Sequence, residues 1–546
     1  MSDDICFSDQ VLIVTTRAVQ RLEKAQPKCK RFHLGCATEA KKVAAAAKCA
    51  MKTMDCICQK LIDSGFRKTT TPVYEMAEKK HFKFQGKIVF VGFGSVAQGV
   101  LPLLLRHIDI PKERISIITG HDRGRAEAES FGIHYEINPL TRENYRAILG
   151  RLLDKGDLLI NLSVDVASSA LIEFCCEKGV LYTDSCIEPW AGGYTDQSVS
   201  ASRRSNYGQR EEVLALRRKF PKGVTVIPTH GANPGLISHW VKQGLINLAR
   251  DILGRSDIPQ SRAEWAQLAM DLGVKSIHCS ERDTQVASPR KQRGEFVNTW
   301  SVDGFIGEGS QPCELGWGSH EKYFPPEGRE HDFGCKAAIY LDRPGASVKV
   351  RTWTPNEGAF HGWLITHGEA ISISDYLTVR DGEKVIYRPT CHYAYHPCDD
   401  TVLSLHELAG KNWVGQKRLR LYRDEIIEGT DELGALLLGH KKGAYWYGSH
   451  LSIREARELA PHNNATSLQV AAGVLGAVVY AMENPAAGII DPDDMDFLRV
   501  LEIAAPYLGK MVGAYSDWTP LQGRNHPFPE DLDVSDPWQF KNVRVT

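Results

Sequence analysis

The chain has 546 residues, of which 42% are hydrophobic, so it is long enough for two or three domains with large cores. Its 66 basic and 67 acidic residues give a formal net charge of −1, which argues against a nucleic-acid-binding protein. The longest uncharged apolar run, residues 470–482, is shorter than the roughly 18 to 20 residues of a membrane span, so we expect a buried helix and no membrane segment.

Residues 1–86 are predicted to form a mainly helical N-terminal extension whose role stays open. The extension is basic, with 16 Lys and Arg against 9 Asp and Glu, and its six cysteines show no C-x-x-C pairing. We expect a helix over 39–61. Asp3 and Asp4 stand where a signal peptide would be cationic, so the expected location is cytoplasmic. Reduced thiols fit that compartment.

Residues 87–231 alternate between apolar strands and helices, the pattern of βαβ units with a parallel sheet. The predicted strands are 88–91, 114–119, 133–137, 158–162, 180–184 and 224–228, and the predicted helices are 96–107, 124–131, 142–153 and 167–178. Such units build a Rossmann domain, a doubly wound α/β fold in which the carboxyl ends of all strands meet at one edge. That edge is where ligands are expected.

A dinucleotide fingerprint follows the first strand. Gly92, Gly94 and Ala97 fill the G-x-G-x-x-G/A positions, with Ser95 and Val96 between them. The first glycine permits a tight turn, the second lets a pyrophosphate approach the backbone, and the alanine lets the helix pack on the strand. We therefore expect these five residues to bind the phosphates of the cofactor at a helix N-terminus.

The second strand ends at Thr119, where an acidic residue would usually hold the ribose hydroxyls. Asp122 lies three residues further on and is a substitute for that acid. Arg123 and Arg125 could instead meet the 2′-phosphate of NADP. The loop leaves the choice of cofactor open, and we favour NAD. Other strand ends at this edge add polar residues for cofactor or substrate: Asn161, Ser163, Asp165 and Glu188.

From residue 232 the pattern changes to helices mixed with strand-like segments, which predicts a second domain of the α+β class over 232–490. A helix is expected from 235 to about 253, and strands over 337–341, 347–353 and 362–366. Residues 491–546 are expected to be helical, then irregular, and to dock back on the body.

Several longer motifs from residue 87 to the C-terminus are similar to those of bacterial-type homospermidine synthases, in the saccharopine-dehydrogenase-like superfamily. They are residues 161–165 (Asn-Leu-Ser-Val-Asp), 188–190 (Glu-Pro-Trp), 231–235 (Gly-Ala-Asn-Pro-Gly), 281–285 (Glu-Arg-Asp-Thr-Gln), 298–302, 314–318, 388–397, 431–434 and 444–448. The resemblance implies a transferase that makes homospermidine and ammonia from two putrescines. It implies NAD as a recycled hydride carrier, a homodimer and no metal, and it leaves spermidine open as a second donor.

The resemblance also implies the substrate site. A diammonium substrate needs carboxylates and an aromatic face, which is worth roughly 1 to 2 kcal/mol for a desolvated cation. The implied acidic residues and indole are Glu281, Glu308, Asp431 and Trp300, and the further polar positions are Asn233, Glu188 and Glu369. His367 is proposed as a proton shuttle from its chemistry alone, against the alternative of a buried structural histidine.

Residues 391–398 contain two histidines four apart with a cysteine at each end, as in some zinc sites. We interpret them as a packed loop without metal. Two other functions stay open: a related NAD(P)-dependent dehydrogenase that reduces a Schiff base between an amino-acid aldehyde and a diamine, and a non-catalytic dinucleotide sensor. A carboxylated substrate would require arginines in the pocket, and the sensor would not need the acidic residues.

Overall fold

The parallel sheet predicted for the first domain has six strands in the order β5-β4-β2-β6-β7-β8. The computed structural model describes residues 79–545, so the helix expected over 39–61 and the cysteines of the extension lie outside the described residues. The strands are β2 (Ile88–Val91), β4 (Ile115–Thr119), β5 (His134–Ile137), β6 (Leu158–Asn161), β7 (Leu181–Asp184) and β8 (Val226–Ile227). The helices between them are α4 (Ser95–His107), α5 (Arg125–Ser130), α6 (Tyr145–Leu152), α7 (Ser168–Lys178) and α8 (Asn206–Lys219).

The strand order places a topological switch point at β2. All pairings in this sheet are parallel, with β4 on one side of β2 and β6 on the other. Every residue of β2 is buried, because helices cover both faces of the sheet. The turn after β2 carries Gly92, so the fingerprint lies where doubly wound folds bind their ligands. The prediction of a Rossmann fold is confirmed.

The second part of the chain forms a mixed sheet of eleven strands. Eight of them lie in the order β13-β14-β12-β19-β9-β22-β23-β24, and the other three branch from β19 through the pairs β19–β16, β16–β15 and β15–β25. Its strands are β9 (Ser276–Asp283), β12 (Pro312–Gly316), β13 (Gly328–Glu330), β14 (Ala338–Pro344), β15 (Lys349–Thr354), β16 (Gly358–Trp363), β19 (Thr390–His396), β22 (Thr430–His440), β23 (Gly443–Ser452), β24 (Lys510–Ser516) and β25 (Arg544–Val545). The pair β19–β9 is parallel, and the neighbouring pair β9–β22 is antiparallel. The expected α+β class is therefore confirmed.

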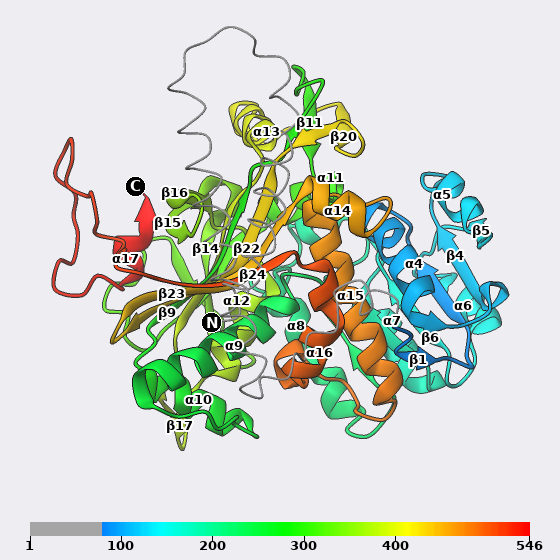
Figure 1. The fold of residues 1–546 in the computed structure, drawn as a ribbon, viewed down its shortest axis with the longest axis horizontal. Coiled ribbons are helices and arrows are strands. Elements are labelled where there is room, and N and C mark those ends of the chain that lie inside the picture. Colours follow the sequence, from blue (N-terminus) through cyan, green and yellow to red (C-terminus); the bar gives the residue numbers. More distant parts are fainter. Residues whose placement is uncertain (1–78, 546) are drawn as a thin grey trace, which may run out of the picture. The chain divides into compact units, whose positions relative to one another are not determined.

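Helices and short strands complete this part (Figure 1). The helices are α9 (Leu236–Leu248), α10 (Arg262–Leu272), α11 (Val302–Ser310), α12 (Gly368–Tyr376), α13 (Asp399–Gly410), α14 (Ile453–Leu459), α15 (Ala465–Glu483), α16 (Phe497–Ala504) and α17 (Phe540–Val543). The short strands of this part pair as β10 (Val286–Ala287) with β21 (Ile426–Glu428), β11 (Glu295–Asn298) with β20 (Arg418–Leu421), and β17 (Val379–Asp381) with β18 (Lys384–Tyr387). A further short pair, β1 (Phe82–Lys83) with β3 (Ile108–Asp109), belongs to the Rossmann part.

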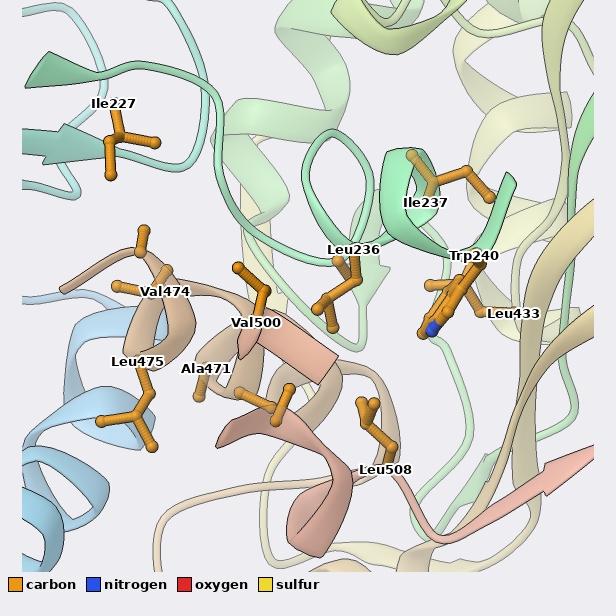
Figure 2. Close-up of a cluster of buried hydrophobic side chains, with 14 of the residues drawn as sticks. Ile227, Leu236, Ile237, Trp240, Leu433, Ala471, Val474, Leu475, Val500 and Leu508 are labelled. Carbon is orange, nitrogen blue, oxygen red and sulfur yellow. The ribbon is translucent and has the colours of Figure 1, made fainter. Parts of the chain in front are cut away.

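Helix α15 joins the two sheets, because it packs on α4 of the Rossmann part and on β22 and β23 of the large sheet. Figure 2 shows Ala471 and Val474 of α15 beside Leu236 of α9 and Val500 of α16, all buried. Within residues 79–545, α15 is the helix long and apolar enough to cross a membrane, and 89% of its apolar window is buried inside the protein. The buried helix expected over 470–482 is confirmed as part of this core element.

Three expectations for the second part were wrong in detail. Residues 391–398 are not a packed loop, because β19 runs through most of them at the centre of the sheet, where alternating aromatic side chains suit a strand. The strand expected over 362–366 lies earlier and ends at Trp363, where the chain turns into α12. The C-terminal segment also contributes a strand, β24, to the edge of the large sheet, which was not predicted.

Candidate active site

A cavity of about 110 Å³ lies between the carboxyl edge of the Rossmann sheet and the strands β9 and β19. We call it the first cavity. Nine residues singled out from the sequence line it: Val96, Asn161, Ser163, Glu188, Asn233, Glu281, Trp300, Glu308 and His367. Two others, Glu369 and Asp431, are buried behind its wall. The fold therefore brings the expected cofactor edge and the expected substrate residues to one space.

The turn after β2 fits a pyrophosphate. A side-chain carbon built on Gly94 would meet no atom within 4 Å, so open space faces this backbone. Helix α4 begins at Ser95 without a side-chain cap, which leaves its first N–H groups free for an anion. Gly92 has a φ of +82° and packs against the backbone of Ser163, where a larger residue would collide. Ala97 is fully buried against the sheet.

Thr119 and the loop after it form the place where the cofactor ribose is expected. Thr119 is 4% exposed, and its hydroxyl has no hydrogen-bond partner among residues 79–545. The loop is held by the Tyr135 hydroxyl, which donates to the carbonyl oxygens of His121 and Arg123 at 2.8 Å. Asp122 is exposed on the same loop. A hydroxyl can donate and accept and a carboxylate can accept, so the two side chains offer the hydrogen bonds that ribose hydroxyls need.

The two arginines of the loop differ. The Arg125 guanidinium lies over the ring of Tyr135, 4.8 Å from its centroid, and 3.8 Å from a carboxylate oxygen of Glu129. Arg125 is thus engaged within its own helix and strand. Arg123 is exposed. Asp165, which was also expected at this edge, follows Ser163 and adopts a positive φ of 63°.

His367 lies between two carboxylates. Its Nε2 is 3.1 Å from Oε2 of Glu308 on α11, and its Nδ1 is 3.2 Å from Oε1 of Glu369 in the first turn of α12. Burial alone would lower the pKa of His367, but the charges of Glu369 and Glu308 outweigh burial and raise this pKa to about 10. The ring is therefore an imidazolium at neutral pH and donates from both nitrogens.

Glu188 and Glu281 are the other two acids that face the first cavity. Burial, followed by the charge of Glu308, raises the pKa of Glu188 to about 8. Burial also raises the pKa of Glu281 to about 8. Two hydrogen bonds oppose this rise: Oε2 of Glu281 accepts one from the Tyr393 hydroxyl and one of 3.4 Å from Asn233 Nδ2. Both carboxyl groups hold a proton at neutral pH until a cation favours their ionised form.

Asp431 lies deeper, opposite Asp283 across the antiparallel pair of β22 and β9. Asp431 is fully buried, and neither of its carboxyl oxygens has a hydrogen-bond partner among the described residues. Burial raises its pKa well above the usual range, and the charges of Glu281 and Asp283 add to this rise. The two aspartates and Glu281 form an acidic layer, of which Glu281 lines the first cavity and the aspartates lie buried behind it.

Aromatic rings form the wall beside these acids. The Trp300 indole Nε1 donates to the Tyr395 hydroxyl at 3.3 Å. Tyr395 stacks on Tyr393 with centroids 5.2 Å apart and planes at 9°, and Tyr393 in turn lies 4.3 Å from the ring of His367. Strand β19 therefore supports the indole, the imidazolium and Glu281 together.

Sequence reasoning missed Asp283, Tyr393 and Tyr395. Each of them lies two residues from another residue of the site or its wall: Asp283 from Glu281, and Tyr395 from Tyr393. On a strand, residues two apart face the same side, so this spacing was the available signal. Within residues 79–545 there is no group of three or more His, Cys, Asp or Glu side chains placed to hold a metal ion.

Comparisons with known proteins agree with this geometry. Residues 88–227 match the Saccharopine dehydrogenase NADP binding domain, and residues 231–516 match the Saccharopine dehydrogenase C-terminal domain. The chain is 52% identical to homospermidine synthase of Blastochloris viridis over 481 residues, which cover 87% of this chain and 99% of that protein. It is 49% identical to homospermidine synthase of Mesorhizobium japonicum over 467 residues, covering 84% and 96%.

A solved structure gives the same relationship. The crystal structure of homospermidine synthase from Legionella pneumophila in complex with NAD is similar to this fold, with a TM-score of 0.80 and 47% sequence identity. The similarity covers 85% of this chain and 98% of that one. The bound NAD of that structure accords with the open groove at Gly94.

Proposed function

This chain belongs to the homospermidine synthase family, and we propose that its first cavity joins two putrescine molecules into homospermidine and ammonia. The observation that carries the proposal is the acidic and aromatic composition of the wall. Glu188, Glu281 and Glu308 face the first cavity beside the Trp300 indole, and none of the described residues that line it is Lys or Arg. An acidic and aromatic site selects a diammonium substrate over a carboxylated one.

NAD supplies the redox chemistry when bound, taking a hydride from the amine-bearing carbon of the first putrescine and returning one to the new carbon–nitrogen double bond. The open space beside the Gly94 backbone, the uncapped start of α4 and the free Thr119 hydroxyl would hold it. The reaction is net transfer of an aminobutyl group, so the enzyme is a transferase.

The carboxyl groups of the first cavity bind the amino groups. At neutral pH Glu188 and Glu281 are largely protonated without substrate, because their pKa values are about 8. An ammonium group that enters favours the carboxylate form, so its binding is coupled to release of a proton. Trp300 offers its ring face to the same cation, and the Tyr395 hydroxyl fixes the orientation of that ring.

His367 handles the proton of the imine exchange. Its Nε2–H can be donated to the nitrogen that leaves as ammonia, while Oε2 of Glu308, 3.1 Å away, takes the proton of the incoming amine. Glu369 keeps the imidazolium oriented through Nδ1 at 3.2 Å. The proton then passes from Glu308 back to Nε2, so the ring returns to its starting state after each exchange.

Exclusion of water protects the imine. Glu281, Glu308 and His367 are each at most 8% exposed, so the reacting carbon would lie in a site with little access to bulk solvent. Water that reached the imine would release an aldehyde and end the transfer. The described cysteines are all free thiols, which agrees with the cytoplasmic location we propose. Spermidine as a second donor and a homodimeric assembly also belong to the proposal.

The test is incubation of the purified protein with putrescine and NAD. We expect homospermidine and ammonia in equal amounts, with no net accumulation of NADH. Accumulation of NADH in step with aldehyde would indicate a simple amine dehydrogenase. Binding of NAD without any product would support the non-catalytic sensor instead.

A further inference from the structure

A second cavity adjoins the first one at the pair formed by His367 and Glu308. Its volume is about 20 Å³, enough for one water-sized molecule, whereas the first cavity has about 110 Å³. Both cavities are lined by His367, Glu308, Cys186 and Pro234. The further lining residues of the second cavity are Ile187, Asn206, Arg210, Thr229, Gly368, Ser372 and Asp491. The proton-handling pair therefore separates two spaces, and the mechanism above uses one of them.

The second cavity is polar but its charges are already balanced. The Arg210 side chain is 8% exposed and pairs with Asp491 at 2.7 Å and with Asp375 at 3.2 Å. Its Nε has no hydrogen-bond partner among the residues that the structure describes. Asp491 is paired with Arg210 and Glu308 with the His367 imidazolium, so neither carboxylate is left free to bind a further cation. The guest that fits is small and neutral and accepts a hydrogen bond.

The reaction produces such a guest. When the amine of the second diamine attacks the iminium carbon of the first, a new carbon–nitrogen bond forms and the original one breaks. The incoming amine loses one proton and the leaving nitrogen gains one, so the products are the substituted iminium ion and neutral ammonia. Ammonia is about the size of water, accepts a hydrogen bond through its lone pair and is formed beside His367.

We propose that the second cavity receives the ammonia released by the imine exchange, an inference that rests on the proposed function. Ammonia that stayed in the first cavity would compete with the second diamine for the same carbon. Transfer past the His367–Glu308 pair separates the two nucleophiles, and the Arg210 guanidinium, which lines the second cavity, is a hydrogen-bond donor for the lone pair of neutral ammonia. The arrangement favours the forward exchange.

Gly368 offers a precise probe of this cavity. A Cβ built on it would lie 3.6 Å from Pro234 Cγ and 3.9 Å from Thr229 Cγ2, which are ordinary contacts with two lining residues. Gly368→Ala therefore adds a methyl group to the wall at the first position of α12. Gly150→Ala is the matched control, because that helical glycine of α6 has open space around its Cβ position and lies far along the chain from both cavities.

The experiment runs the exchange in reverse with the full chain and NAD. Homospermidine and ¹⁵N-ammonium chloride are supplied, and ¹⁵N in putrescine is measured by mass spectrometry. We expect Gly368→Ala to slow incorporation about ten-fold and to raise the ammonium concentration needed for half-maximal rate, because the added methyl group occupies part of a cavity with room for about one small molecule. Reduction of NAD by putrescine in a single turnover should keep its rate, and Gly150→Ala should match the wild type in both assays.

Wild-type incorporation of ¹⁵N by Gly368→Ala would overturn the proposal. Gly368→Ala could also lose the single-turnover reduction of NAD by putrescine. In that case the double variant Gly368→Ala/Ile187→Val is assayed for ¹⁵N incorporation, because Ile187→Val removes a methylene group from another part of the wall of the second cavity. Recovery of ¹⁵N incorporation supports the ammonia site, and failure to recover contradicts it. A wild-type protein that reduces NAD with putrescine but forms no homospermidine would instead refute the proposed function.

Discussion

The indole Nε1 of Trp300 and the hydroxyl oxygen of Tyr395 lie 3.3 Å apart and are joined by a hydrogen bond. Trp300 precedes α11, whereas Tyr395 lies on the central strand β19. The Trp300 side chain, which lies just before the first turn of α11, is thereby fixed to a central strand of the large sheet. The ring is held with one edge bonded, which leaves its face available to an ammonium group.

Replacing Trp300 with Ala should lower kcat/KM for putrescine by about 30-fold, because a desolvated cation–π contact is worth roughly 2 kcal/mol. Trp300→Phe keeps an aromatic face but lacks the Nε1 donor. Its decrease in kcat/KM should therefore be smaller than that of Trp300→Ala and similar to that of Tyr395→Phe. Steady-state kinetics give these values, and fluorescence titration should show unchanged NAD affinity in all three. Full activity of Trp300→Ala would remove the cation–π argument.

Tyr393→Phe should shift the pH profile. The Tyr393 hydroxyl hydrogen bond lowers the pKa of Glu281, which burial has raised to about 8. Loss of that bond raises this pKa further, so a higher pH is needed to ionise Glu281 and bind the ammonium group. We expect the acidic limb of kcat/KM to move up by about one pH unit. Tyr395→Phe is the control, because the Tyr395 hydroxyl bonds Trp300 and not Glu281. The acidic limb of kcat/KM should stay at the wild-type pH in this variant.

His367→Gln should reduce homospermidine formation by roughly 100-fold or more, because the proton donor for the leaving ammonia is lost. Glu369→Gln should act more subtly. Glu369 raises the pKa of His367, so the variant lowers that pKa from about 10 and moves the alkaline limb of kcat to lower pH. The pH dependence of kcat measures both effects. If the alkaline limb of kcat has the same pKa in Glu369→Gln as in the wild type, deprotonation of His367 does not limit activity at high pH.

The ribose loop should prefer NAD. Arg125 is engaged with Tyr135 and Glu129, and Arg123 is exposed, so no arginine is preset for a 2′-phosphate. We expect kcat/KM with NAD to exceed that with NADP, and Arg123→Ala should leave the NAD value unchanged. The comparison needs only initial rates with each cofactor. Faster turnover with NADP, abolished in Arg123→Ala, would reverse the assignment.

Much of the Rossmann part could be predicted from the sequence, because its strands are short apolar runs buried on both faces and its phosphate turn requires small residues. The strand β19 could not be predicted from the sequence. Its Cys, His and Tyr residues resemble a metal loop in composition, and only pairing with β9 and β16 shows that they alternate across a sheet.

The candidate site was predictable only in part for a related reason. The motifs indicated Glu281 and Asp431 as single acids, but their strand register brings Asp283 into the same layer. Likewise, the hydrogen bonds from Tyr393 to Glu281 and from Trp300 to Tyr395 join residues about 100 positions apart. Contacts of this range follow from the pairing of strands, which local patterns do not specify.

The central claim is that one site removes a hydride from the first diamine and returns it to the same carbon after the exchange. The direct measurement uses an equal mixture of unlabelled putrescine and putrescine fully deuterated at both nitrogen-bearing carbons, with mass analysis of the homospermidine. We predict only products in which each aminobutyl unit is either fully labelled or unlabelled. Units that have gained or lost a single deuterium would show exchange through free NADH and contradict the account.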